Sequence, residues 1–202
     1  MGVVIFGVIA LYLIVSLVVV VLVARAAKTS GKSPWRWGGA AALVMYLLVF
    51  WDHIPTVVAH KYYCEKEAGF WMYKTVEKWK QENPRMAESF VAAKGAPSNR
   101  QGDMDNYTDT YFLNQRFNWI VKHNGQFLFN RWRHEQVVMD SNSGEVLARY
   151  IDFSTSQIRR QAGWSGWKMW LDVRHCSDGA NDEGKMGQFM LQAKDPLKGS
   201  KQ

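Results

Sequence analysis

Residues 3–24, VVIFGVIALYLIVSLVVVVLVA, form one apolar run in which only Tyr12 and Ser16 are mildly polar. A helix of about 20 apolar residues spans the hydrocarbon core of a bilayer, so this run predicts a transmembrane helix. A cleaved signal peptide is the alternative, because Ala24-Arg25-Ala26 has a small-x-small pattern. However, no positive side chain precedes the run, and it is longer than the roughly 7–15 apolar residues of a signal. We therefore expect an anchor that is retained.

A second apolar run covers residues 37–59 and is interrupted near its end by Asp52 and His53. The two runs predict a transmembrane helical hairpin, at 3–24 and 37–59, joined by a loop at 25–36. Ionisable residues within a membrane segment are functional candidates, so Asp52 and His53 form a candidate intramembrane polar site. The simpler interpretation is that both side chains reach the lipid headgroups.

The loop between the runs carries four cations and no acid: Arg25, Lys28, Lys32 and Arg36. Short loops rich in Lys and Arg stay on the cytoplasmic side of a membrane. The N-terminus and everything after His60 are therefore expected on the opposite side.

The net charge of the chain is +7, from 25 Lys and Arg against 18 Asp and Glu. Four of the cations belong to the loop and one of the acids is Asp52, so residues 60–202 carry only about +4. This charge is too small and too dispersed to indicate a nucleic-acid surface. The expected partners are the lipid bilayer and another protein, with a homo-oligomer also conceivable.

The two cysteines, Cys64 and Cys176, both follow the second run, which places them in an oxidising compartment. A disulfide between them is the favoured interpretation. Two free thiols or a zinc site are the alternatives, because His60 precedes Cys64 by four residues and His175 adjoins Cys176. Zinc motifs usually supply two pairs of ligands, with the members of each pair a few residues apart. His175 and Cys176 are adjacent in sequence and do not have this spacing. We therefore expect neither a metal nor a cofactor.

Residues 56–83 predict a helix that continues out of the membrane, with a charged face and an apolar face. Asn83-Pro84 ends this helix, and a second helix is expected from Pro84 to Val91. A loop rich in Gly and Pro follows, up to about residue 102.

After that loop the apolar side chains alternate, which predicts strands. Asn124-Gly125 is the strongest short signal for a hairpin turn. That turn would place Val121 opposite Leu128 and Phe117 opposite Trp132. Two further strands are expected at 145–153 and 167–173, with a turn at 140–144 between the second and third strands.

This pattern predicts an α+β fold in which a long helix packs on an antiparallel meander of about four strands. The expected division is a membrane hairpin at 1–59, an extracytoplasmic α+β domain at 60–176, and a loose C-terminal tail at 177–202. The tail is assigned as loose because it is rich in Gly, Lys and Asp.

No catalytic residue is assigned. Ser154-Thr155-Ser156 has no base that the sequence identifies, and His134-Glu135 is most simply an exposed position on a strand. Trp and Arg act as anchors at protein interfaces, and they cluster near the end of the domain. The predicted partner-binding residues are Arg159, Arg160, Trp164, Trp167 and Trp170. Packing of these tryptophans in the core is the alternative.

The segment from Cys64 to Thr75, CEKEAGFWMYKT, resembles a segment of small uncharacterised bacterial and phage proteins that also carry hydrophobic anchors. The resemblance implies a bacterial inner-membrane location and no activity. We expect a periplasmic protein-binding module anchored in that membrane, either an exclusion or immunity factor or an accessory subunit of an envelope complex. A membrane-tethered hydrolase of envelope material, and an oligomer assembled through the hairpin, are the alternatives.

Overall fold

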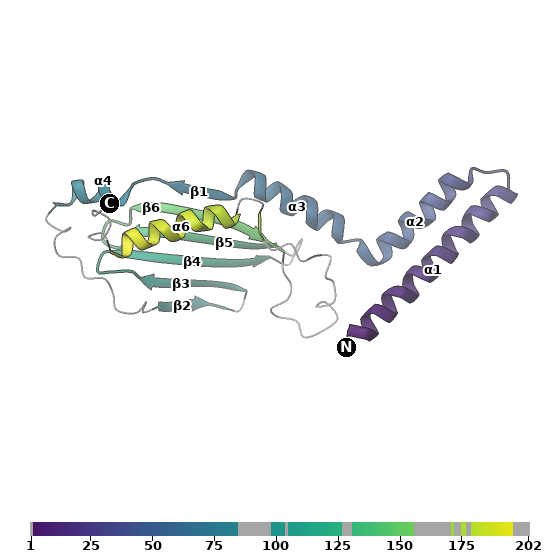
Figure 1. Cartoon of the computed structure of the whole chain (residues 1–202), viewed down its shortest axis with the longest axis horizontal. Coiled ribbons are helices and arrows are strands. Elements are labelled where there is room, and N and C mark those ends of the chain that lie inside the picture. Colours follow the sequence, from purple (N-terminus) through teal and green to yellow (C-terminus); the bar gives the residue numbers. More distant parts are fainter. Residues whose placement is uncertain are drawn as a thin grey trace.

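The computed structural model describes residues 2–84, 98–103, 105–126, 131–155, 171, 175–176 and 179–195, with side chains from Phe6 onward. Helices at the N-terminus lead into an antiparallel sheet that carries one helix across its face (Figure 1). The chain is therefore an α+β protein, as the sequence predicts.

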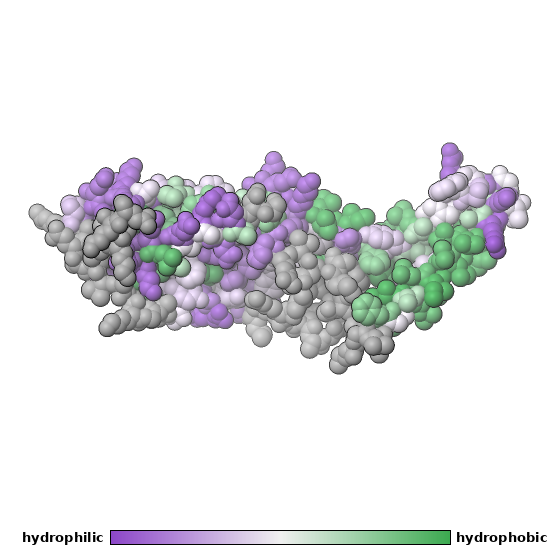
Figure 2. Space-filling view, viewed as in Figure 1, coloured by the Kyte–Doolittle hydropathy of each residue, from purple (hydrophilic) through white to green (hydrophobic). Residues whose placement is uncertain are grey.

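The first helix, α1 (Gly2–Thr29), contains the predicted membrane segment. Within it, the most apolar window of 18 residues has a mean hydropathy of 3.1, and none of that window is buried inside the protein. Gly31, at a φ of 71°, ends the helix, because Lys32 N–H can then reach back to the Ala27 carbonyl at 2.8 Å. Figure 2 shows the apolar surface gathered over α1 and the helix that follows it.

The second predicted span, residues 37–59, is not one continuous helix. It is divided into α2 (Pro34–Phe50) and α3 (His53–Lys66), which are bent by 69° at the break between them. Pro55 has no N–H to donate to the Trp51 carbonyl, and its ring clashes with a continuous helix at that point. Among the described residues, α1 is the one helix that is long and apolar enough by itself to cross a membrane; α2 and α3 meet that test only together.

The helix predicted at 56–83 is also wrong in its extent. The chain leaves α3 after Lys66, forms strand β1 (Gly69–Met72) and then the short helix α4 (Val76–Glu82). Thr75 caps α4, because its side chain accepts a hydrogen bond from Lys78 N–H at 3.1 Å. The helix expected from Pro84 to Val91 falls almost wholly outside the described residues.

The sheet has six strands where about four were expected, and its order is β1-β6-β5-β4-β3-β2 with every pair antiparallel. The strands after β1 are β2 (Ser98–Gly102), β3 (Asn106–Phe112), β4 (Phe117–Gln126), β5 (Arg131–Asp140) and β6 (Val146–Ser154). The predicted third strand and the turn before it are confirmed as β6 and the β5–β6 connection. The predicted strand at 167–173 lies outside the described residues except for Leu171.

The Asn124-Gly125 turn is wrong, because both residues lie inside β4. Gln126 pairs with Arg131, so the connection between β4 and β5 is 127–130. Gly125 is opposite Trp132, and a Cβ at Gly125 would come within 2.9 Å of that indole ring. The glycine therefore accommodates a neighbouring ring on the sheet and does not make a turn.

The tail predicted to be loose contains helix α6 (Gly179–Lys194), which packs across one face of the sheet (Figure 1). We call this the helix face. Met186, Phe189 and Ala193 are spaced at helical intervals and are fully or almost fully buried. The main core lies between α6, α4 and the sheet: Val76, Trp79, Leu113, Phe117, Val138, Leu147, Ala148, Tyr150, Met186, Phe189 and Ala193. The long helix that packs across the sheet is thus the C-terminal one, and the short α4 packs beside it.

Candidate functional site

The predicted disulfide is confirmed: Cys64 near the end of α3 is bonded to Cys176, across a sequence separation of 112 residues and a Cα–Cα distance of 5.5 Å. Cys176 is held to the sheet because its backbone N–H donates to Asp152 Oδ1 at 3.1 Å. The bridge therefore joins α3 to the segment that follows the sheet in sequence, at the end of the sheet where α3 packs. A disulfide is consistent with an oxidising compartment.

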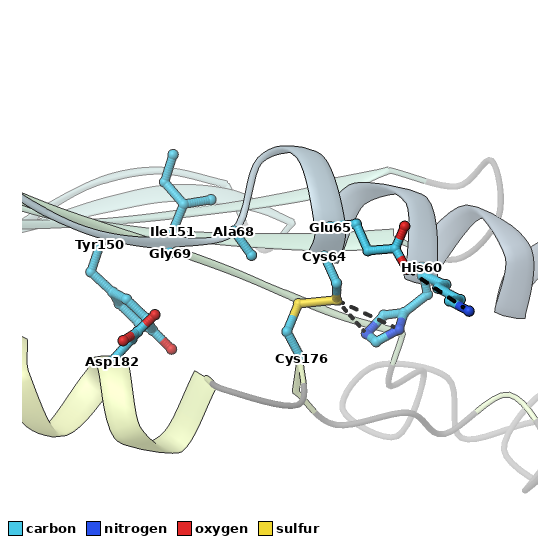
Figure 3. Close-up of a pocket in the computed structure, with 10 residues that line it drawn as sticks. His60, Cys64, Glu65, Ala68, Gly69, Tyr150, Ile151, Cys176 and Asp182 are labelled. Carbon is cyan, nitrogen blue, oxygen red and sulfur yellow. Dashed lines mark hydrogen bonds and ion pairs between the residues drawn. A yellow bond between two sulfur atoms is a disulfide. The ribbon is translucent and has the colours of Figure 1, made fainter.

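His60 lies beside this disulfide, one helical turn before Cys64 (Figure 3). Its Nε2 is 3.1 Å from the Phe153 carbonyl oxygen, which can only accept, so Nε2 carries the proton and donates. In the neutral ring Nδ1 is then the acceptor, and Nδ1 and Nε2 lie 3.7 and 3.6 Å from Cys64 Sγ. The sheet thus fixes both the tautomer and the orientation of the ring.

A cavity of about 570 Å³ opens beside the disulfide. Its lining includes His60, Cys64, Cys176, Tyr150 and Asp182, and the last two are drawn close together in Figure 3. Burial, and secondarily the negative charge of Asp152, raise the pKa of the Tyr150 hydroxyl. Tyr150 therefore stays protonated at neutral pH and can donate a hydrogen bond.

Four polar side chains form a row across the sheet beyond the end of its apolar core. Tyr107, His123, His134 and Asp152 are successive register partners on β3, β4, β5 and β6. Tyr107 stacks on His123 with ring centroids 4.4 Å apart, and His123 Nδ1 is 2.7 Å from His134 Nδ1. At the β6 end, Asp152 Oδ2 contacts His175 Nδ1 at 2.5 Å. We call this set the histidine row.

The histidine row places a serine next to an imidazole. His134 Nε2 is 2.9 Å from Ser154 Oγ, the arrangement in which a base activates a nucleophile. Ser154 is only 6% exposed, which restricts access for a substrate. The two Nδ1 atoms share one hydrogen bond, so at most one of the pair carries a proton there. Sequence reasoning assigned His134 to an exposed strand; the missed signal was that two of only five histidines lie on neighbouring strands.

The face of the sheet opposite the helix face, which we call the open face, carries a groove of about 600 Å³. Its lining mixes apolar and charged side chains: Tyr73, Ile120, Lys122, Glu135, Val137, Met139, Val146 and Arg149. The carboxylate of Glu135, one of these residues, lies 2.6 Å from Arg133 and 2.7 Å from Arg149. Burial alone would raise the pKa of Glu135, but the two guanidinium groups outweigh it and the net pKa is lowered. Glu135 is therefore charged at neutral pH.

The other predicted site residues are placed differently. Asp52 and His53 lie at the bend between α2 and α3, where His53 Nδ1 is 2.8 Å from the Tyr46 hydroxyl. The predicted partner-binding residues Arg159, Arg160, Trp164, Trp167 and Trp170 lie outside the described residues, so their grouping stays a prediction.

No protein-family model matches this chain, and neither a curated protein nor a solved structure is significantly similar to it.

Proposed function

We propose that this chain is a periplasmic protein-binding module anchored in the bacterial inner membrane. The observation that carries the proposal is the groove on the open face, because the described helices pack on the helix face or beside β6 and leave this groove accessible. A surface that combines apolar and charged side chains is typical of a protein-binding surface. If the chain is an accessory subunit, its partner is another component of the cell envelope. If it is an exclusion or immunity factor, its partner is a protein of an incoming phage, a conjugation machine or a toxin.

The anchor in this proposal is a hairpin in which α1 is one span and α2 with the start of α3 is a second, broken span. Tyr12 donates a hydrogen bond to the Met45 carbonyl, and Gly38 lets α2 approach Ala24 closely, since a Cβ there would lie 3.3 Å from the Ala24 Cβ. Small residues at such contacts favour helix association in lipid. The cationic loop then faces the cytoplasm, and both the N-terminus and the sheet domain face the periplasm.

Reporter fusions test this topology. Alkaline phosphatase fused after Gln202 is expected to be active, because it folds only where disulfides form, and a fusion at Lys28 is expected to be inactive. An inactive fusion after Gln202 contradicts both the topology and the periplasmic assignment.

Site-specific photo-crosslinking in cells tests the groove. A photoreactive residue at Ile120, inside the groove, is expected to capture a defined partner, while one at Gln188 on the exposed side of α6 is not. Lys122→Glu is expected to abolish the Ile120 crosslink, because it reverses a charge on the groove rim, and Lys185→Glu on α6 is the matched control. Equal capture from Ile120 and Gln188, or no effect of Lys122→Glu, contradicts the proposal.

The Trp/Arg cluster is tested by changing Trp164 and Trp167 together to Ala. If they are interface anchors, the loss of partner affinity is at least about 2 kcal/mol, measured with a double variant whose disulfide and membrane level are intact. Unchanged affinity assigns the cluster to packing.

A membrane-tethered hydrolase is the second candidate, favoured by the contact of His134 with Ser154. The binding proposal expects His134→Gln and His175→Gln, each made singly, to leave the activity of the protein in cells nearly unchanged. Loss of activity in His134→Gln and in Ser154→Ala, with fold and membrane level preserved, decides for the hydrolase.

A further inference from the structure

The residues around the disulfide also have the chemistry of a metal site. The ligand atoms of His60, Cys64 and Cys176 all lie within 4.8 Å of one another. Two thiolates and an imidazole are a common set of protein ligands for zinc. The disulfide occupies both sulfur atoms, so any such site exists only when the bond is reduced.

The distance from His60 to Cys64 already suits zinc. Bond lengths of about 2.3 Å to sulfur and about 2.0 Å to nitrogen, at a tetrahedral angle, separate the two ligand atoms by about 3.6 Å. The ring nitrogens of His60 lie 3.6 and 3.7 Å from Cys64 Sγ. Only the sulfur of Cys176 has to move, since in the disulfide it is bonded to its partner.

The orientation of His60 is a second, independent observation. A histidine that binds a metal almost always donates its other ring N–H to a carbonyl or carboxylate. His60 does this without a metal, because Nε2 lies within hydrogen-bond distance of the Phe153 carbonyl, and in the neutral ring Nδ1 is then the nitrogen that can bind a metal; Nδ1 and Nε2 lie 3.7 and 3.6 Å from Cys64 Sγ. His175, the histidine adjacent to Cys176 in sequence, is instead engaged through Nδ1 with Asp152.

The fourth coordination position faces the cavity. His60, Cys64 and Cys176 all line the 570 Å³ space, and Glu65 and Asp182 line it as well (Figure 3). Zinc sites with three protein ligands and an open fourth position bind water or a ligand there.

We propose that the Cys64–Cys176 pair and His60 form a redox-gated site for Zn²⁺. A dithiol reductant delivers two electrons and two protons to the disulfide and is itself oxidised to a disulfide, which leaves two thiols. Zn²⁺ then displaces both thiol protons into solvent and binds two thiolates and His60 Nδ1. A disulfide oxidant that takes two electrons from the two thiolates, and is itself reduced to a dithiol with two protons from solvent, reforms the Cys64–Cys176 bond and releases the ion. In the reduced state zinc replaces the disulfide as the link between α3 and the end of the sheet domain.

The test measures zinc binding to the full chain in detergent, oxidised and reduced, by competition with a chromophoric chelator. The reduced protein is expected to bind one Zn²⁺ and the oxidised protein none at the same concentration. Co²⁺ in place of Zn²⁺ is expected to produce thiolate-to-cobalt charge-transfer absorption. Zinc is also expected to raise the melting temperature of the reduced protein alone.

Variants separate a built site from two unrelated thiols. His60→Gln is expected to weaken zinc binding by more than the roughly 10- to 100-fold that loss of a supporting hydrogen bond costs a metal site. His175→Gln is the matched control and is expected to bind as the wild type does. Equal zinc binding by reduced His60→Gln and reduced wild type overturns the proposal. This outcome is also expected if reduction unfolds the domain, because zinc would then bind the two thiols without His60. Binding by the reduced wild type no stronger than by Cys64→Ser with Cys176→Ser overturns it as well.

Discussion

The two faces of the six-stranded sheet are held together by different kinds of contact. On the helix face, α6 and α4 bury a continuous apolar core in which Phe117 and Phe189 are almost inaccessible. On the open face, Glu135 and two arginines form a charged network beside exposed apolar side chains such as Phe112. Burial of apolar area dominates folding energy, while partly exposed ion pairs contribute little. The core under α6 therefore supplies most of the stability. On the open face, Ile151 and Phe153 pack against α3 in a smaller buried cluster, and the groove beside it is left for recognition.

The largest expected effect is a difference in stability between two phenylalanine variants, one on each face of the sheet. Phe117→Ala removes a fully buried ring that contacts Trp79 with centroids 4.8 Å apart, so we expect a loss of about 3–5 kcal/mol of unfolding free energy. Phe112→Ala, on the open face and 40% exposed, is expected to cost less than about 1 kcal/mol. Chemical denaturation of both variants measures the difference; similar losses would mean that the open face is also a core.

The next largest loss of stability is expected on removal of the disulfide, which joins α3 to the segment that follows the sheet. Replacing Cys64 and Cys176 together by Ser is expected to lower stability by about 2–4 kcal/mol, because the unfolded chain loses a closed loop that spans 112 positions. The difference in denaturation midpoint between oxidised and reduced wild type provides the control. A variant as stable as the oxidised wild type contradicts a structural role for the bridge.

A smaller effect is expected at Asp140, a buried carboxylate at the edge of the core. Burial would raise its pKa, but bonds from the Asn142 and Ser143 N–H groups, the Trp79 indole and Arg116 outweigh burial and lower it. Asp140→Asn is expected to cost about 1.5–3 kcal/mol. Glu135→Gln is the corresponding change on the open face, and it is expected to lower the unfolding free energy by less than Asp140→Asn does.

The lowered pKa of Asp140 also determines a pH dependence. A carboxyl whose pKa is lower in the folded state stabilises the protein above its unfolded pKa of about 3.9, and this contribution is lost as the pH falls through the folded value. Unfolding free energy is therefore expected to fall below about pH 4 in the wild type, and less steeply in Asp140→Asn. Parallel pH profiles for the two proteins contradict this assignment.

The smallest effect on stability is expected at the groove rim. Lys122→Glu changes an exposed side chain on the open face, and the expected change in stability is within about 0.5 kcal/mol. Its effect on partner capture is nevertheless expected to be large. If Lys122→Glu lowers both the unfolding free energy and the capture of the partner, the open face also contributes to stability, and the two faces do not have separate roles.

Sequence patterns succeeded where the signal is local and failed where it depends on a neighbour. The apolar run of α1, the turn before β6 and the α+β class follow from composition and alternation. Gly125 was misassigned because its function is to accommodate Trp132 on the next strand, which no local pattern reveals. The C-terminal helix was misassigned because its composition is polar, although Met186, Phe189 and Ala193 have helical spacing that a periodicity count would have detected.

The sequence by itself determined the apolar N-terminal helix and the cationic loop, because each depends on residue type and order along the chain. It favoured a bond between its two cysteines, and the structure decided for that bond. The tertiary structure alone decided that α6 covers the sheet, that Tyr107, His123, His134 and Asp152 align in a row, and that His60 faces the disulfide. Those arrangements depend on strand register and on packing between segments more than 80 residues apart, such as His60 and Phe153. Register is specified by how all the strands bury their side chains together, so no single segment carries the information.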